Sequence, residues 1–199
     1  MTKMTAPAYS AFAGSKLLAS GALAEVAIAI KIATGGLADP IVIFDNATGK
    51  SLDLDLRGSH REIVARLTPP EEPAKVAEPE PRGPGRPKLG VVAREITLLP
   101  RHWDWLAGQP GGASVALRKL VEEARRANAD RDRQRAARDA AYHFMSAMAG
   151  DLPNFEEASR ALFADDRRGL AERIAGWPAD IRDHVVSLAF RDRADAPTA

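Results

Sequence analysis

Side chains that commonly carry catalysis or bind metals are few in this chain, and their spacing matches no catalytic or metal-site pattern. The four histidines are scattered, and none has a partner at the spacing of a motif such as HExxH; they are His60, His102, His143 and His184. The chain has no cysteine, which excludes thiolate metal sites, cysteine nucleophiles and disulfides. We therefore expect no catalytic residue, no metal and no cofactor.

A group of aspartates is the remaining candidate for acid–base chemistry or cation binding. Asp53 and Asp55 alternate with leucines and so share one face of an expected strand, and Asp45 lies across the preceding turn. A polar outer face explains the same pattern. Gly14-Ser15-Lys16 lacks the glycine spacing of a phosphate-binding loop.

Clustered basic residues indicate phosphate binding more strongly. The whole chain has 28 Lys and Arg against 27 Asp and Glu, so a basic surface must come from local segregation. Residues 82–101 hold five basic residues and one acidic residue, and residues 114–138 hold eight and four, a net +4 in each range. Such a surface neutralises DNA phosphates with an affinity that falls with salt. A solvated helix and a solubilising linker would give the same composition.

The elements that position these charges are short. Residues 94–98 alternate as a strand, and Pro100 suits the start of a helix over 101–107. Pro110-Gly111-Gly112 forms a turn, and Ser114 is the expected cap of a helix over 114–126. Trp103 and Trp105 are two residues apart, so they face different sides of their helix, one in the core and the other toward a partner or nucleic acid.

This order of strand, helix, glycine turn and helix resembles the ribbon-helix-helix DNA-binding fold, which implies a homodimer whose paired strands enter the major groove of DNA. The resemblance implies that Glu95 and Thr97 point at base edges. It places Ser114, with the Val115 amide, against a phosphate, followed by Arg118 and Lys119. It also implies a dimer core made of Ile96, Leu98, Trp103, Leu106, Leu117, Leu120 and Val121.

The basic tether before this unit resembles the core of an AT-hook, which lies in the minor groove of A·T tracts. The match is Gly85-Arg86-Pro87-Lys88, and Pro84 stands where that core has a second arginine, leaving the more distant Arg82. We expect Arg82, Arg86 and Lys88 to contact DNA phosphates.

The fold class expected from the pattern is α+β. Residues 8–68 predict a β-β-α-β-β-α module, with strands near 9–13, 17–19, 40–44 and 52–56, a helix over 22–34, and a second helix that opens with a capping box from Ser59 to Glu62. Residues 69–93 form a Pro-rich linker, 94–126 the strand-helix-helix unit, and 127–191 a helical bundle. Residues 1–7 and 192–199 are expected to be disordered ends.

Over its whole length the chain resembles a bacterial family of unknown function, the one numbered twenty-two thirty-nine. The resemblance rests on DLDLRG at 53–58, on residues 94–126 and on the WP pair at 177–178. That family implies no activity.

The sequence thus favours a DNA-binding regulator that acts as a homodimer, with double-stranded DNA as its partner. The alternative is a non-catalytic homodimeric scaffold for protein–protein interaction, and an enzyme is the third reading. The most apolar run, 22–33, contains Glu25 and Lys31 and is too short to span a bilayer, so we expect a cytoplasmic protein without a membrane partner. The sequence does not define a small-molecule ligand.

Overall fold

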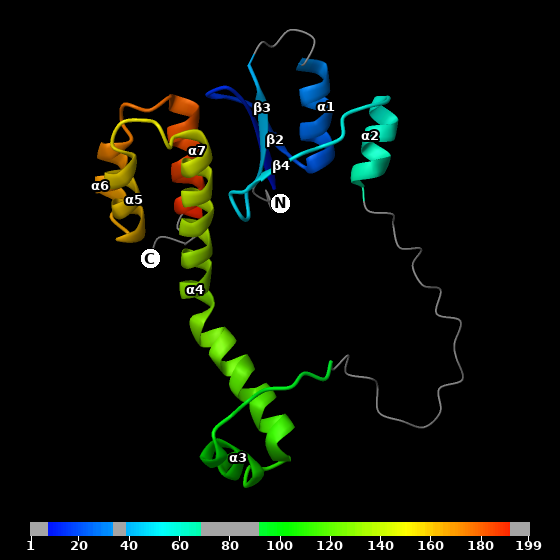
Figure 1. Ribbon diagram of the computed structural model, residues 1–199, viewed down its shortest axis with the longest axis vertical. Coiled ribbons are helices and arrows are strands. Elements are labelled where there is room, and N and C mark those ends of the chain that lie inside the picture. The colour runs from blue at the N-terminus through cyan, green and yellow to red at the C-terminus, as the bar shows by residue number, and fades with distance from the viewer. Residues whose placement is uncertain (1–7, 34–38, 69–91, 192–199) are drawn as a thin grey trace, which may run out of the picture. The chain divides into compact units, whose positions relative to one another are not determined.

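The computed structural model describes residues 8–33, 39–68 and 92–191 (Figure 1). The predictions of disordered ends and of a Pro-rich linker fall mainly on residues outside these ranges. Within the described residues the protein is a mixed α+β structure, with one small antiparallel sheet near the N-terminus and a mostly helical C-terminal part. The predicted fold class is confirmed.

The sheet has four strands in the order β2-β1-β3-β4, all paired antiparallel. β1 is Tyr9–Ala13, β2 is Lys16–Gly21, β3 is Ile41–Asp45 and β4 is Ser51–Leu52. Helix α1 (Leu23–Ala33) follows β2, and helix α2 (His60–Leu67) follows β4. The element order is therefore the β-β-α-β-β-α expected from the sequence.

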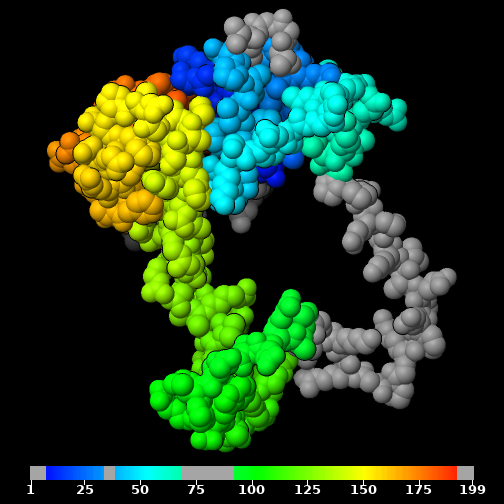
Figure 2. Space-filling view, viewed as in Figure 1, coloured from blue at the N-terminus to red at the C-terminus, as the bar shows by residue number. Residues whose placement is uncertain are grey.

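One face of the sheet packs against α1. Ala11 and Ile43 project from neighbouring strands and pack with Val26 and Ile30 of the helix. The leucines of the alternating stretch after residue 51 pack on the same core, as the sequence predicted. α2 follows with the predicted capping box, in which the Ser59 hydroxyl accepts from the Glu62 N–H and the Glu62 carboxylate accepts from the Ser59 N–H. The segment between β4 and α2 runs over the surface in light cyan in Figure 2.

The opposite face of the sheet packs against helices from the far end of the chain. These are the C-terminal part of α4 (Gly112–Met148) and α7 (Ala179–Ala189), which lie across the sheet from α1 in Figure 1. Phe12 and Phe44 on the sheet meet Phe144 of α4, with ring centroids 5.1 and 4.8 Å from that of Phe144. The sheet is thus covered on both faces. Successive residues of β1 and β3 therefore point alternately into the core against α1 and into the core against α4 and α7.

The remaining helices complete this second core. α5 (Phe155–Phe163) and α6 (Arg167–Arg173) contribute Leu162 and Leu170, both fully buried. Trp177 is also buried, and its indole N–H donates to the Pro153 carbonyl at 2.8 Å. Because burying an indole N–H without an acceptor is costly, this bond fixes how the segment before α7 packs.

The chain divides into two compact units that cut across the predicted domains. One unit contains residues 1–71 and 131–199, and the other contains residues 72–130. The sequence pattern placed 8–68 and 127–191 in different domains, but the phenylalanine cluster gives them one core. α4 contributes residues to both units. Polar residues in its middle hid this continuity, because periodic apolar residues are the main sequence signal of a helix.

Two local predictions differ from the structure. Residues 92–99 form neither helix nor strand, so the strand predicted over 94–98 is not paired with any other described residue. Ser114 is not a helix cap, because α4 begins at Gly112 and Ser114 lies in its first turn. Gly111 and Gly112 have φ angles of 86° and 74°, which residues with a side chain rarely adopt. The helix begins after this glycine turn, at Gly112, two residues before the predicted start at Ser114.

The turn between β3 and β4 packs directly on α4. Gly49 is buried with φ of 66°, and a Cβ placed on it would collide with the backbone carbonyl of Ala140. A ring nitrogen of His143, Nδ1, lies 2.9 Å from the Thr48 carbonyl. The Asp45 carboxylate accepts from the Ala47 N–H and the Thr48 hydroxyl, which holds the turn in shape.

We predict that Gly49→Ala destabilises the protein by on the order of 2–4 kcal/mol, because the new methyl group meets backbone and the φ angle disfavours alanine. Urea unfolding followed by circular dichroism measures this loss. Gly176→Ala is the matched control, since a Cβ there meets nothing within 4 Å. Equal stability of both variants would contradict the close packing of the turn on α4.

His184 of α7 lies inside the aromatic core and gives a pH prediction. Its ring packs against Phe12 and Phe144, and burial, aided by the charge of Arg191, lowers its pKa from 6.5 to about 4. As the pH falls, His184 therefore becomes protonated at a higher pH in the unfolded chain than in the folded protein. Stability should be fully present above pH 6.5 and decline toward pH 4, by ~1.4 kcal/mol per pH unit and on the order of 3 kcal/mol in total.

Unfolding free energies of the protein and of His184→Leu, compared across this pH range, measure the effect. The variant should lose this part of the pH dependence, whereas the exposed His60→Gln should keep it. Parallel curves for all three proteins would show that folding does not change the pKa of His184.

Candidate functional site

The second unit is built from very few elements. Its described residues are the irregular segment 92–99, α3 (Pro100–Ala107) and the first part of α4 up to residue 130. Pro100 opens α3 without a side-chain cap, and Gly108 closes it by donating its N–H to the Asp104 carbonyl. The Gly111-Gly112 turn then reverses the chain, so that α3 packs against the start of α4.

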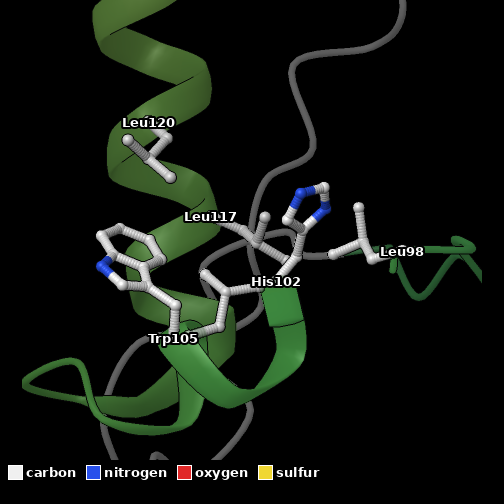
Figure 3. Close-up of a pocket in the computed structure, with 6 residues that line it drawn as sticks. Leu98, His102, Trp105, Leu117 and Leu120 are labelled. Atoms are coloured by element: carbon white, nitrogen blue, oxygen red, sulfur yellow. The ribbon is translucent and has the colours of Figure 1, made fainter. Parts of the chain in front are cut away.

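An apolar groove lies between α3, α4 and the preceding segment (Figure 3). It has a volume of about 280 Å³. Figure 3 shows Trp105 and His102 from α3, Leu117 and Leu120 from α4, and Leu98 from the irregular segment around this hollow. Leu106 forms its floor and is 3% exposed. The site therefore offers shape and apolar surface, and His102 is the one titratable side chain among its described lining residues.

The unit that carries the groove exposes several large hydrophobic side chains. They are between 41% and 75% exposed, the highest values being 75% for Val92 and 64% for Val121. The set comprises Val92, Ile96, Leu99, Trp103, Trp105, Leu120 and Val121. Among the described residues of this unit, only Leu106 and Ala116 are buried hydrophobics. So many exposed large hydrophobic side chains in one small unit indicate an interaction site.

The structure brings together part of the predicted dimer core. Leu98, Leu106, Leu117 and Leu120 all line the groove. Ile96, Trp103 and Val121 are exposed and do not line it. Leu106 is already buried within this chain. The other six residues of the predicted dimer core remain accessible for contact with another chain.

The predicted phosphate ligands in the described residues lie at the start of α4. Ser114, Arg118 and Lys119 are exposed, and the Arg118 side chain donates from Nε to the Ser114 carbonyl at 3.0 Å. Lys119 makes no hydrogen bond or ion pair with the described residues. The predicted base-reading residues Glu95 and Thr97 are exposed as well. Arg82, Arg86 and Lys88 lie outside the described residues.

Further along α4, several arginines are engaged within the helix itself. Arg125 and Arg126 both pair with Glu122, at 3.0 and 3.2 Å, and Arg135 pairs with Asp132 at 3.0 Å. The two guanidinium groups keep the pKa of the Glu122 carboxyl below its usual value, chiefly through the hydrogen bond from Arg125. These ion pairs are exposed and reduce the charge that the helix presents to a polyanion.

Two of the three aspartates considered for acid–base chemistry serve local structure. Asp45 holds its own turn, and Asp55 accepts from the side chains of Arg57 and Arg66. The side-chain and backbone hydrogen bonds from Arg57 lower the pKa of Asp55 to about 2. Across residues 8–33, 39–68 and 92–191, no three acidic or histidine side chains gather closely enough to hold a metal ion.

The sequence reading missed His102 as part of the groove and left the role of Trp105 open. Both are visible in hindsight, because Leu98, His102, Trp105 and Leu106 follow the spacing of one helical face. The helix begins only at Pro100, so Leu98 reaches this face from the segment before it. The expected dimer core had already placed Leu98 with Leu106, Leu117 and Leu120, but it did not include His102.

The architecture is that of a mixed α+β protein. One unit has a small sheet covered on both faces, and the second, helical unit carries an apolar groove. The chain belongs to the family described as "Uncharacterized protein conserved in bacteria (DUF2239)", whose model matches residues 8–189. This match confirms the resemblance found in the sequence. No curated protein and no solved structure shows significant similarity to the chain. In the described part of the chain, no helix has the length and apolar character needed to cross a membrane.

Proposed function

We propose that this protein is a homodimer assembled through the unit that contains residues 92–130, and that the dimer binds double-stranded DNA. The observation that carries the proposal is the apolar surface around the groove. Two short helices and one extended segment bury too little apolar area to form a complete core. A second chain that covers Trp105, Leu120 and Val121 would supply the missing burial, at about 25 cal/mol per Å² of apolar surface.

A second copy of the same chain fits this surface. Residues 92–130 hold six Lys and Arg and five Asp and Glu, so two copies can approach without strong repulsion. Residues 94–98 are unpaired within the chain and carry Ile96 toward solvent. In the proposed dimer these segments pair antiparallel, as the resemblance to the ribbon-helix-helix fold implies.

DNA binding rests on the basic residues beside the apolar surface. Arg118 and Lys119 are exposed one turn into α4, and the basic segment 82–88 precedes the unit in sequence. Dimerisation doubles each of these charges on one assembly. Phosphate neutralisation then supplies affinity that depends on salt more than on base sequence. Glu95 and Thr97 would lie on the paired strands and face the bases.

The second candidate is a homodimeric protein–protein interaction scaffold that does not bind nucleic acid. One observation favours it: the ion pairs of Arg125, Arg126 and Arg135 within α4 use cations that a DNA surface would need. Both candidates require the dimer, so DNA binding is the property that separates them.

We predict that the protein sediments at twice the mass of one chain, and that Val121→Glu or Ile96→Glu weakens the dimer by at least about 100-fold. A carboxylate placed in an apolar contact loses its hydration without gaining a partner. Analytical ultracentrifugation over a range of concentrations measures the change. Both side chains are exposed in the single chain, so the fold itself should persist.

Ile32→Glu is the matched control, because Ile32 is 69% exposed on α1, outside this unit. It should leave association unchanged. A monomer at every concentration for the unaltered protein would refute the homodimer, and equal association of all variants would move the interface elsewhere.

We predict that the dimer binds a random DNA duplex at low salt and that the double variant Arg118→Ala with Lys119→Ala binds more weakly. Each lost phosphate contact reduces the slope of log K against log salt by about 0.9, and each substitution occurs twice in a dimer. Fluorescence anisotropy of a labelled duplex gives both affinity and slope. Arg168→Ala on α6 is the control. A dimer without salt-dependent duplex binding would leave the scaffold as the function.

A further inference from the structure

The apolar groove contains an ionisable side chain whose charge bears on what can cover it. The imidazole of His102 lies between Leu98 and Leu117 in Figure 3, and the rest of the described lining is two more leucines and Trp105. The ring is exposed in the single chain and forms no hydrogen bond or ion pair with any described residue. Hydration is therefore what stabilises a proton on this ring in the single chain.

Charged residues lie close to His102 in this unit, but none of those that the structure describes lines the groove. They are Arg94 and Glu95 before α3, Arg101 and Asp104 on α3, and Arg118 and Lys119 on α4. The Arg118 guanidinium is directed to the Ser114 carbonyl of its own helix. A carboxylate facing the ring would favour its protonated form, whereas an apolar surface favours the neutral form. The faces that α3, α4 and the preceding segment turn toward the groove are of the second kind.

A second chain placed over the groove would take water away from this ring. A neutral imidazole then loses only weak hydration, whereas an imidazolium loses the hydration of a full charge. Imidazole side chains change charge at about pH 6.5, so a modest change of pH around neutrality selects between the two forms.

We propose that His102 makes the association of this protein sensitive to pH, so that two chains associate when the ring is neutral and separate when it is protonated. This inference rests on the homodimer proposed above, because a second copy is the occupant of the groove. Each dimer contains two such rings, so separation of the chains takes up as many as two protons. If both rings must be neutral in the dimer, the Kd rises by about 100-fold from pH 7.5 to pH 5.5.

Analytical ultracentrifugation of the full-length protein at pH 7.5, 6.5 and 5.5, at constant ionic strength, gives the Kd at each pH. Circular dichroism at the same pH values verifies that the chain is folded. We expect the Kd at pH 5.5 to exceed that at pH 7.5 by at least about tenfold. A constant Kd would overturn this inference and leave the homodimer standing. Tighter association at pH 5.5 would also overturn it, since the charged ring would then have a carboxylate partner in the dimer. A monomer at every pH would refute the homodimer itself, and this inference with it.

His102→Phe and His102→Gln place two different neutral side chains in the groove. In each variant the Kd should change by less than about threefold between pH 7.5 and pH 5.5, whatever its value at pH 7.5. Both variants retain His184, so an acid effect that arises from the stability of the fold would persist in them. His60→Gln replaces an exposed histidine of α2, outside this unit, and should retain the full pH dependence. An acid effect in the His102 variants equal to that of the unaltered protein would assign it to another group and overturn the proposal.

Discussion

The contact among Phe12, Phe44 and Phe144 holds the first unit together. The first two rings come from neighbouring strands of the sheet, and the third comes from a helix, one hundred residues after Phe44. All three side chains are fully buried, and edge-to-face packing adds to the burial of their large apolar surfaces. A four-stranded sheet with one covered face would leave this aromatic surface in water. The helices of the C-terminal part are therefore required for the N-terminal sheet to be stable.

The dependence runs in both directions. α5 and α6 are short, with nine and seven residues, and isolated helices of that length are unstable in water. Their buried leucines pack on α7 and α4, which in turn pack on the sheet. Polar contacts secure the same junction, such as the Leu17 N–H that donates to the Asp180 carboxylate at 2.9 Å. The order of the chain is thus a poor guide to which parts fold together.

Local features could be predicted from the sequence because their physical causes are local. The alternation of Leu52, Leu54 and Leu56, the helical spacing of Val26 and Ile30, and the capping box at Ser59 each depend on neighbouring residues, and the structure has all three. The shared core could not be predicted, because periodicity can show that a side chain is buried without showing which distant side chain it meets. The continuity of α4 was hidden by its charged middle. The groove was only partly predicted, since Leu98, Leu106, Leu117 and Leu120 were expected to share a core but His102 and Trp105 were not assigned to it.

The three tryptophans are divided between the two units in a way that gives each unit its own optical signal. Trp177 is 4% exposed and holds its hydrogen bond to Pro153 in the first unit, whereas Trp103 and Trp105 are 41% and 53% exposed in the second. Indole emission shifts to the red in water, so the buried ring should emit at the blue side of the band and resist collisional quenchers. Covering the groove would change the emission of Trp105, which lines it, and leave Trp177 as an internal reference. The chain therefore reports separately on its folding and on the occupancy of its apolar surface, with no added dye.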